Sequence, residues 1–257
     1  MCHRSTRHAP AFMHMLKDEE NAKYRQSIKN TIEFDKDILK RFVNFMNNPD
    51  EETAVAQFGK GDKYFGVSLV MVTMPGLPMF GHGQVEGFGE KYGMEYRRAY
   101  WDEQPDWGLI KRHEQEIFPI MKKRYVFSEV ANFLLFDLFG ESGAVNENIL
   151  AYSNQYGHER ALVLYNNNYE RSWGWIKISS GYVEKNADGS KTHHQKSLGE
   201  ALGLHNDWRY FCIFREHRSG LWFIRNSGEI WNNGMFVGLN GYEAQVCMDL
   251  REVQDNE

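Results

Sequence analysis

The feature that most constrains the fold is a change in hydrophobic pattern near Val126. After this point the chain consists of short apolar runs, rich in aromatic and β-branched residues, that are separated by turn-forming Gly, Asn and Asp residues. The runs are ILAYSN, ALVLYN, GWIKIS, WRYFCIF, LWFIRN, MFVGL and YEAQVCMDL. This pattern predicts an antiparallel, all-β domain over residues 126–257.

Residues 1–125 mix two periodicities and predict an α/β domain. Short apolar runs at residues 41–46 and 77–81 favour strands, and the stretch between them, residues 62–74, is apolar on nearly every face and favours a buried helix. A further helical pattern begins at Asp106. Alternating strands and helices imply parallel pairing, with the loops that follow the strands gathered at one edge. The join near residue 126 has no Pro- or Ser-rich linker, so we expect the two parts to be packed together.

Composition excludes several classes of function. The chain has 257 residues and a formal charge of −5 that is spread along its length, which disfavours nucleic acid as a partner. Its cysteines, Cys2, Cys212 and Cys247, are too scattered for a disulfide framework or a metal site, and we expect neither a metal nor another cofactor. No apolar run suits a signal peptide or a membrane span, so a soluble, cytoplasmic protein without a membrane partner is the default, provided that the N-terminus is native.

The stretch FMNNPDEETA, residues 45–54, places three acids directly after the first predicted strand. In a parallel α/β domain the carboxyl ends of the strands surround the active site, so Asp50 is well placed for chemistry. The alternative is that Asp50, Glu51 and Glu52 open the next helix, where acids complement the helix dipole. The local pattern alone favours this alternative.

Two motifs in a fixed order, joined by the buried helix, support the first interpretation. They are Phe45, Asn48 and Asp50 at the first strand, and Pro75, Gly76, Pro78, Gly83 and Gln84 around the second. This arrangement resembles the C-terminal end of the catalytic barrel of the α-amylase family, glycoside hydrolase family 13. The resemblance implies that residues 1–125 are the last strands and helices of an incomplete (β/α)8 barrel, a TIM barrel, and that residues 126–257 are a C-terminal β-sandwich.

The resemblance also implies roles for individual residues. Asp50 would be the transition-state stabiliser, a carboxylate whose hydrogen bonds to sugar hydroxyls strengthen as positive charge develops. Asn48, His82 and Gln84 would contact the substrate, with Asn48 also holding the strand-end loop in shape. The family has His where Pro49 stands, and His82 is expected to supply the missing contact; a loop histidine without a ligand is an equal alternative.

Retaining hydrolysis also needs a nucleophile and a general acid about 5 Å apart, which the family carries on earlier strands. The acids before residue 41 lie at a predicted helix start or in a polar connector. We therefore expect a fragment of an α-glucan-active hydrolase that is inactive alone, with the missing N-terminal part of the barrel as a partner and an oligo- or polysaccharide as ligand. The basic, patternless first ten residues suit a truncated or split gene product. A non-catalytic carbohydrate-binding or structural β module is the alternative.

Three other signals are weaker. Trp173 and Trp175 are two residues apart and share one face of a predicted strand; exposed pairs stack on sugars, but packing in a core is the more frequent arrangement. His193 and His194 are adjacent and point apart, which favours a loop pair over a metal site. The polar segment 183–203 predicts a mobile loop that leads into a short helix.

Overall fold

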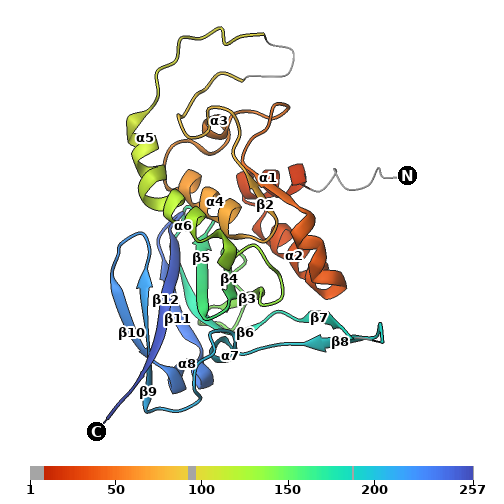
Figure 1. Ribbon diagram of the computed structural model, residues 1–257, viewed down its shortest axis with the longest axis vertical. Helices are drawn as coiled ribbons and strands as arrows, with labels where there is room; N and C mark the ends of the chain where they lie inside the picture. Colours follow the sequence, from red (N-terminus) through yellow and green to blue (C-terminus); the bar gives the residue numbers. More distant parts are fainter. Residues whose placement is uncertain (1–8, 92–96, 187, 257) are drawn as a thin grey trace.

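A computed structural model describes residues 9–91, 97–186 and 188–256 of the chain. Its helical first part, with a small parallel sheet, is stacked on an antiparallel β domain (Figure 1). One cluster of buried hydrophobic residues extends through both parts, so they are packed together as the lack of a linker predicted. The domain boundary between residues 125 and 126 stays a prediction. Within the described ranges, no helix is long and apolar enough to cross a membrane.

The first part contains a parallel βαβ unit. Strands β1 (Val43–Phe45) and β2 (Leu77–Met79) pair in parallel, and α4 (Asp62–Thr73) connects them. The predicted strands, helix and parallel pairing are confirmed, whereas a barrel around these two strands stays a prediction. The other helices are α1 (Ala9–Lys17), α2 (Asn21–Asp35), α3 (Ala54–Phe58), α5 (Trp107–Arg112) and α6 (Phe118–Lys122), with 3-10 turns at Lys36–Arg41 and Arg124–Val126 and a π-helical turn at His113–Ile117.

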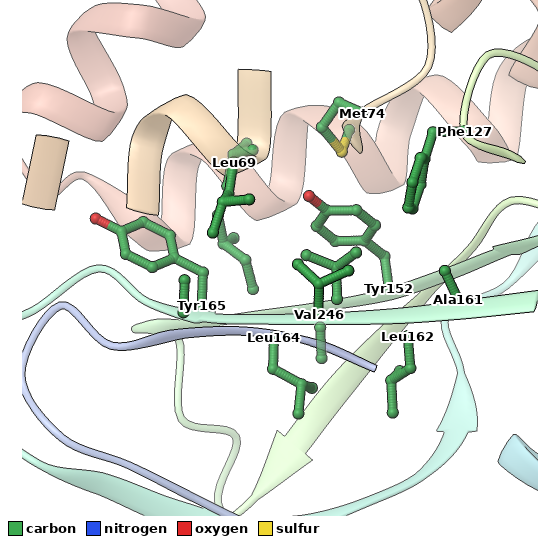
Figure 2. Packing of buried hydrophobic residues seen from close by; sticks show 14 of the residues in the cluster. Leu69, Met74, Phe127, Tyr152, Ala161, Leu162, Leu164, Tyr165 and Val246 are labelled. Carbon is green, nitrogen blue, oxygen red and sulfur yellow. The ribbon is translucent and has the colours of Figure 1, made fainter. Parts of the chain in front are cut away.

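Helix α4 is the centre of the packing between the two parts. Every residue from Tyr64 to Thr73 is buried, as expected of a helix that is apolar on all sides. Tyr152 and Tyr165 point from the sheet towards the helix that carries Leu69 (Figure 2). The Thr73 hydroxyl is 2.6 Å from the Tyr152 hydroxyl, so polar groups at this contact satisfy each other.

The β domain is one eight-stranded antiparallel sheet in the order β10-β9-β12-β5-β4-β3-β6-β11. Its strands are β3 (Leu134–Phe139), β4 (Ile149–Tyr156), β5 (Glu159–Asn166), β6 (Ser172–Ser179), β9 (Tyr210–Glu216), β10 (Trp222–Asn226), β11 (Met235–Leu239) and β12 (Ala244–Gln254), with helix α8 (Ser227–Asn233) between β10 and β11. The seven predicted runs are all strands. The sequence did not single out β3.

The predicted sandwich of two sheets is replaced by this continuous, curled sheet. Strand β12 pairs with β5 through its first residues and with β9 through its later ones, and the register shifts between Met248 and Arg251. Asp249 adopts a positive φ of 54° at this irregularity. A bulge bends a strand and strengthens its twist, which lets one long strand belong to both halves of the sheet. Neighbours such as Leu164 and Tyr165 point to opposite faces, as successive residues of a strand do, and both are buried (Figure 2).

The segment predicted to be a mobile loop is a β-hairpin. Strands β7 (Tyr182–Lys185) and β8 (Lys191–His194) pair in antiparallel fashion and project sideways from the domain (Figure 1). His193 and His194 are therefore strand residues with opposite orientations, not a loop pair. The short helix after the hairpin, α7 (Leu198–Ala201), is confirmed, and a capping box between Ser197 and Glu200 begins it.

Two cysteines lie in the sheet. Cys212 on β9 and Cys247 on β12 are both buried and unpaired with each other. Burial raises the pKa of each thiol to about 12. They are therefore packing residues rather than nucleophiles. Cys2 lies outside the described residues.

Arg25 on α2 joins the helical part to the β domain. Its side chain is fully buried, and its Nε donates to the Glu147 carboxylate at 2.7 Å. The same guanidinium pairs with Asp137 on β3 and donates to the Ile149 carbonyl on β4. A buried charge is tolerated only when it is paired and hydrogen-bonded, and Arg25 meets both conditions. One turn earlier, Asn21 donates to the Asn167 carbonyl at 2.8 Å.

We expect Arg25→Ala to lower the free energy of unfolding by roughly 3–5 kcal/mol, because it leaves the buried Ile149 carbonyl and the partly buried Asp137 carboxylate without this partner and removes a fully buried side chain. Urea unfolding followed by circular dichroism measures this change. Arg209→Ala is the matched control, since Arg209 also pairs with a carboxylate, Asp207, but at the surface. Equal unfolding midpoints for the two variants would contradict a structural role for Arg25.

Candidate functional site

The turn after β1 carries Asp50. Asn48, Pro49, Asp50 and Glu51 form a β-turn in which the Glu51 N–H donates to the Asn48 carbonyl at 3.2 Å. The Asn48 side-chain oxygen also accepts from the Asp50 and Glu51 N–H groups at 2.8 and 3.0 Å. Asn at the first and Pro at the second position both favour such a turn. The expectation that Asn48 shapes the loop is thus confirmed, while its contact with substrate stays a prediction.

The Asp50 side chain is exposed at the tip of this turn. Helix α3 has Thr53 as its N-cap and no acid in its first turn, so the three acids precede the helix rather than open it. The interpretation of Glu51 and Glu52 as helix-starting acids is therefore wrong. Glu51 instead lies 3.2 Å from His14 on α1.

The Pro-Gly turn before β2 has a steric cause. Gly76 has a positive φ of 105°, and a side chain there would collide with the Phe42 carbonyl. That carbonyl accepts from the Leu77 N–H at 2.8 Å, which begins the pairing of β2 with the chain before β1. Asn44 on β1 also donates to the Pro75 carbonyl at 2.9 Å. Glycine is required because the backbones approach closely at a left-handed position.

Gln84, after β2, points into the protein. The residue is 1% exposed, and its amide oxygen accepts from the Gly81 N–H at 3.1 Å. Its amide nitrogen lies 3.4 Å from the Met46 sulfur. Because both ends of the amide are used inside the protein, the predicted contact of Gln84 with substrate does not fit this placement, and its role is to close the loop.

His82 lies on the exposed side of the same loop. It borders a pocket with Phe88, Trp101 and Asp102, and its ring centre is 6.2 Å from that of Phe88. The loop touches the Asp50 turn in two places. Gly81 packs directly on the Asn47 side chain, and Lys91 donates to the Asp50 carbonyl at 3.0 Å. The structure thus brings the loops of Asn48, Asp50 and His82 to one edge, with Gln84 buried below them.

Two carboxylates, Glu90 and Glu103, hold the pocket wall together through backbone N–H groups. Glu103 accepts from the N–H groups of Gly89 and Glu90 at 2.7 and 2.9 Å. Glu90 in turn accepts from the N–H groups of Tyr100 and Trp101 at 2.8 and 3.0 Å. No local sequence pattern predicts these hydrogen bonds, because they join residues ten or more positions apart in the chain.

His113 and Tyr64 support the site from beneath. The Tyr64 hydroxyl donates to the Gln84 carbonyl at 2.6 Å and lies 3.0 Å from Nε2 of His113. Since the hydroxyl proton is used on Gln84, Nε2 must carry the imidazole proton and donate it to Tyr64. Burial, and then the positive charge of Arg112, lower the pKa of His113 to about 4. The sequence offered no sign of this pair, which spans 49 positions.

We expect His113 to make stability depend on pH. In the unfolded chain its pKa is 6.5 and in the folded protein about 4, so the unfolded state binds the extra proton as the pH falls. The contribution of the neutral His113 imidazole to the free energy of unfolding is complete above pH 6.5 and is lost as the pH falls towards 4. By pH 5 the loss is on the order of 2 kcal/mol.

His113→Gln keeps a donor for Tyr64 but does not titrate. Unfolding free energies of both proteins at pH 7.5 and pH 5 separate this effect from the titration of carboxylates, which the two proteins share. An equal loss in both proteins between these pH values would exclude His113 as its source.

Two acids of the N-terminal region, Glu19 between α1 and α2 and Asp35 at the end of α2, have structural partners. Glu19 binds Lys63 at 2.6 Å and accepts from the Tyr242 hydroxyl at 2.6 Å. Asp35 binds Lys185 of the β7–β8 hairpin at 2.5 Å. These contacts tie the helices to other elements, and neither acid stands at the end of a parallel strand.

The fold and the strand-end loops define a class: the described residues have the fold of the C-terminal part of α-amylase-family glycoside hydrolases, as the resemblance of the motifs implied. An α-amylase from Geobacillus thermoleovorans complexed with acarbose matches with a TM-score of 0.53 and 14% identity, over 82% of this chain and 39% of that enzyme. A maltogenic α-amylase from Thermotoga neapolitana matches with a TM-score of 0.56 and 12% identity, over 91% of this chain and 47% of that enzyme.

An acarbose-soaked debranching enzyme from Nostoc punctiforme matches with a TM-score of 0.51 and 12% identity, over 88% of this chain and 38% of that enzyme. The chain therefore spans less than half the length of these solved enzymes. No protein-family model and no curated protein matches the sequence. At such identities the likeness concerns the fold alone.

Proposed function

We propose that the chain is the C-terminal portion of an α-glucan-active glycoside hydrolase in which Asp50 is the transition-state-stabilising carboxylate. The observation that carries the proposal is the β1–α4–β2 unit, which sets the Asp50 turn and the His82 loop at the carboxyl edge of parallel strands. Ligand sites in parallel sheets form at this edge. In the proposal, residues 1–125 belong to an incomplete barrel and residues 126–257 to the β domain.

Asp50 would act through hydrogen bonds and charge. Its carboxylate accepts from hydroxyls of the sugar whose glycosidic bond breaks, and its negative charge stabilises the positive charge that develops on the ring. The turn built by Asn48 fixes the direction of the carboxylate, because the backbone N–H of Asp50 itself is bound to Asn48. In the proposal, His82 on the neighbouring loop, which borders a pocket, donates to a further hydroxyl.

Catalysis would need more than this chain's described residues. The nucleophile and the general acid must stand about 5 Å apart beside the sugar, and we place them on strands that pair with the outer edges of β1 and β2. Such strands belong to a longer chain or to a partner. The chain alone is then expected to bind an α-glucan analogue without cleaving it.

We expect the chain to bind acarbose, the ligand of the Geobacillus and Nostoc structures, weakly at the Asp50 turn. Asp50→Asn should weaken this binding roughly tenfold or more, because a hydrogen bond to a charged acceptor contributes about 1.5–3 kcal/mol. An NMR titration that follows the backbone amides of residues 48 and 50–53 reports on this site alone. Glu52→Gln is the control, since Glu52 is an exposed neighbouring acid without a proposed role.

If the shift changes on addition of acarbose gave the same dissociation constant for the wild-type and Asp50→Asn proteins, the role of Asp50 would be refuted. That result would favour a non-catalytic β module. Steady release of reducing ends from maltoheptaose by the purified chain, at a rate that Asp50→Asn does not change, would refute the role of Asp50 as well. Both readouts use the full chain.

A further inference from the structure

The outer face of β6 carries an aromatic surface that the proposed site does not use. Trp173 and Trp175 are 45% and 41% exposed, so the interpretation of this pair as core packing is wrong. Phe236 on the edge strand β11 pairs with Trp175 and is 53% exposed, with the two ring centres 5.5 Å apart and the rings inclined by 67°. Phe139 on β3 pairs with Trp175 from the other side. We call these four residues the aromatic platform.

Polar groups border the aromatic platform. The Trp173 indole N–H donates to the Glu141 carboxylate at 3.3 Å, which restrains the orientation of the ring. Residues on a strand alternate between faces, so Arg171 and Lys177 continue the row of Trp173 and Trp175 at its two ends. Gly238 lies opposite Trp173, and the Arg171 guanidinium lies near the space that a side chain at Gly238 would occupy. The surface is therefore flat beside Trp173 and has hydrogen-bonding groups around it.

We propose that the aromatic platform binds a glycan, with sugar rings lying flat against Trp173 and Trp175. The C–H groups on the face of a pyranose carry partial positive charge, and an aromatic face is negative, so the two attract each other while apolar area is removed from water. The two indoles are about 6.7 Å apart along the strand, which lets successive sugar units each contact a ring. Glu141, Arg171 and Lys177 are placed to bind the outward hydroxyls.

The size of the surface favours a glycan over a second copy of the chain. The exposed parts of Trp173, Trp175 and Phe236 amount to roughly 300 Å². A stable protein dimer buries about 800 Å² on each partner. A patch of a few rings with a polar border therefore matches one or two sugar units rather than a protein interface.

The aromatic platform is independent of Asp50. Its residues come from β3, β6 and β11 and the turn beside them, whereas the proposed site lies at the ends of β1 and β2. Only the choice of an α-glucan as the probe rests on the proposed function.

Affinity gel electrophoresis in soluble starch, with maltoheptaose titrations by calorimetry, tests the proposal on the full chain. Trp175→Ala and Trp173→Ala are each expected to weaken binding roughly tenfold, since stacking on one aromatic ring is worth about 1–3 kcal/mol in the comparable case of nucleobases. Trp222→Ala is the matched control. Trp222 is 54% exposed on β10, at the other end of the sheet, and the Arg251 guanidinium already covers its ring at 5.5 Å.

Trp222→Ala should migrate like the wild-type chain. Equal retardation of the Trp175→Ala and wild-type proteins would overturn the proposal, as would an equal loss in Trp222→Ala. Sedimentation that shows a dimer dissociated by Trp175→Ala would overturn it too, because the surface would then be a self-association face. The tryptophan variants and the wild-type chain all keep Asp50, so failure of the Asp50 proposal leaves the difference between Trp175→Ala and the wild-type chain unchanged.

Discussion

The position of the candidate site depends on the buried charge of Arg25. Its guanidinium has left water entirely, so its ion pairs and hydrogen bonds to β3 and β4 hold α2 at one place on the sheet. Helix α2 then positions its neighbours through aromatic contacts: Phe12 on α1 packs against Tyr24 on α2 at 5.5 Å and against Phe42, just before β1, at 5.2 Å. Arg25 thus fixes α2 on the β domain, and α2 in turn fixes the position of β1, the strand that precedes the Asp50 turn.

The site separates supporting residues from exposed ones. Gln84, Tyr64 and His113 are buried and are joined through the Tyr64 hydroxyl, so they define the shape of the loop after β2 without facing solvent. Asp50 and His82 stand above them on two loops that touch through Gly81 and Lys91. A rigid base with few exposed groups is the arrangement that orients side chains for binding.

The two proposed glycan contacts lie in different layers of one packed molecule. A polymer held on the aromatic platform by Trp173 and Trp175 would have a high local concentration near the Asp50 loops, because the second contact becomes intramolecular. The gain depends on the glycan being long enough to reach from one surface to the other. Short oligosaccharides would bind each surface separately, so chain length distinguishes independent from joint binding.

The sequence by itself determined the elements whose cause is local. Aromatic-rich apolar runs predicted the strands of the β domain, and the uniformly apolar run predicted the buried helix α4. Asn48 and Pro49 form the turn that presents Asp50, and both residue types favour such a turn locally. Only the tertiary structure decided that Gln84 points inward, that His113 supports it across 49 residues through Tyr64, and that Trp173 and Trp175 face solvent. The reason is physical: propensity and periodicity report on neighbours along the chain, whereas burial and distant hydrogen bonds depend on how the curled sheet and the helices cover one another.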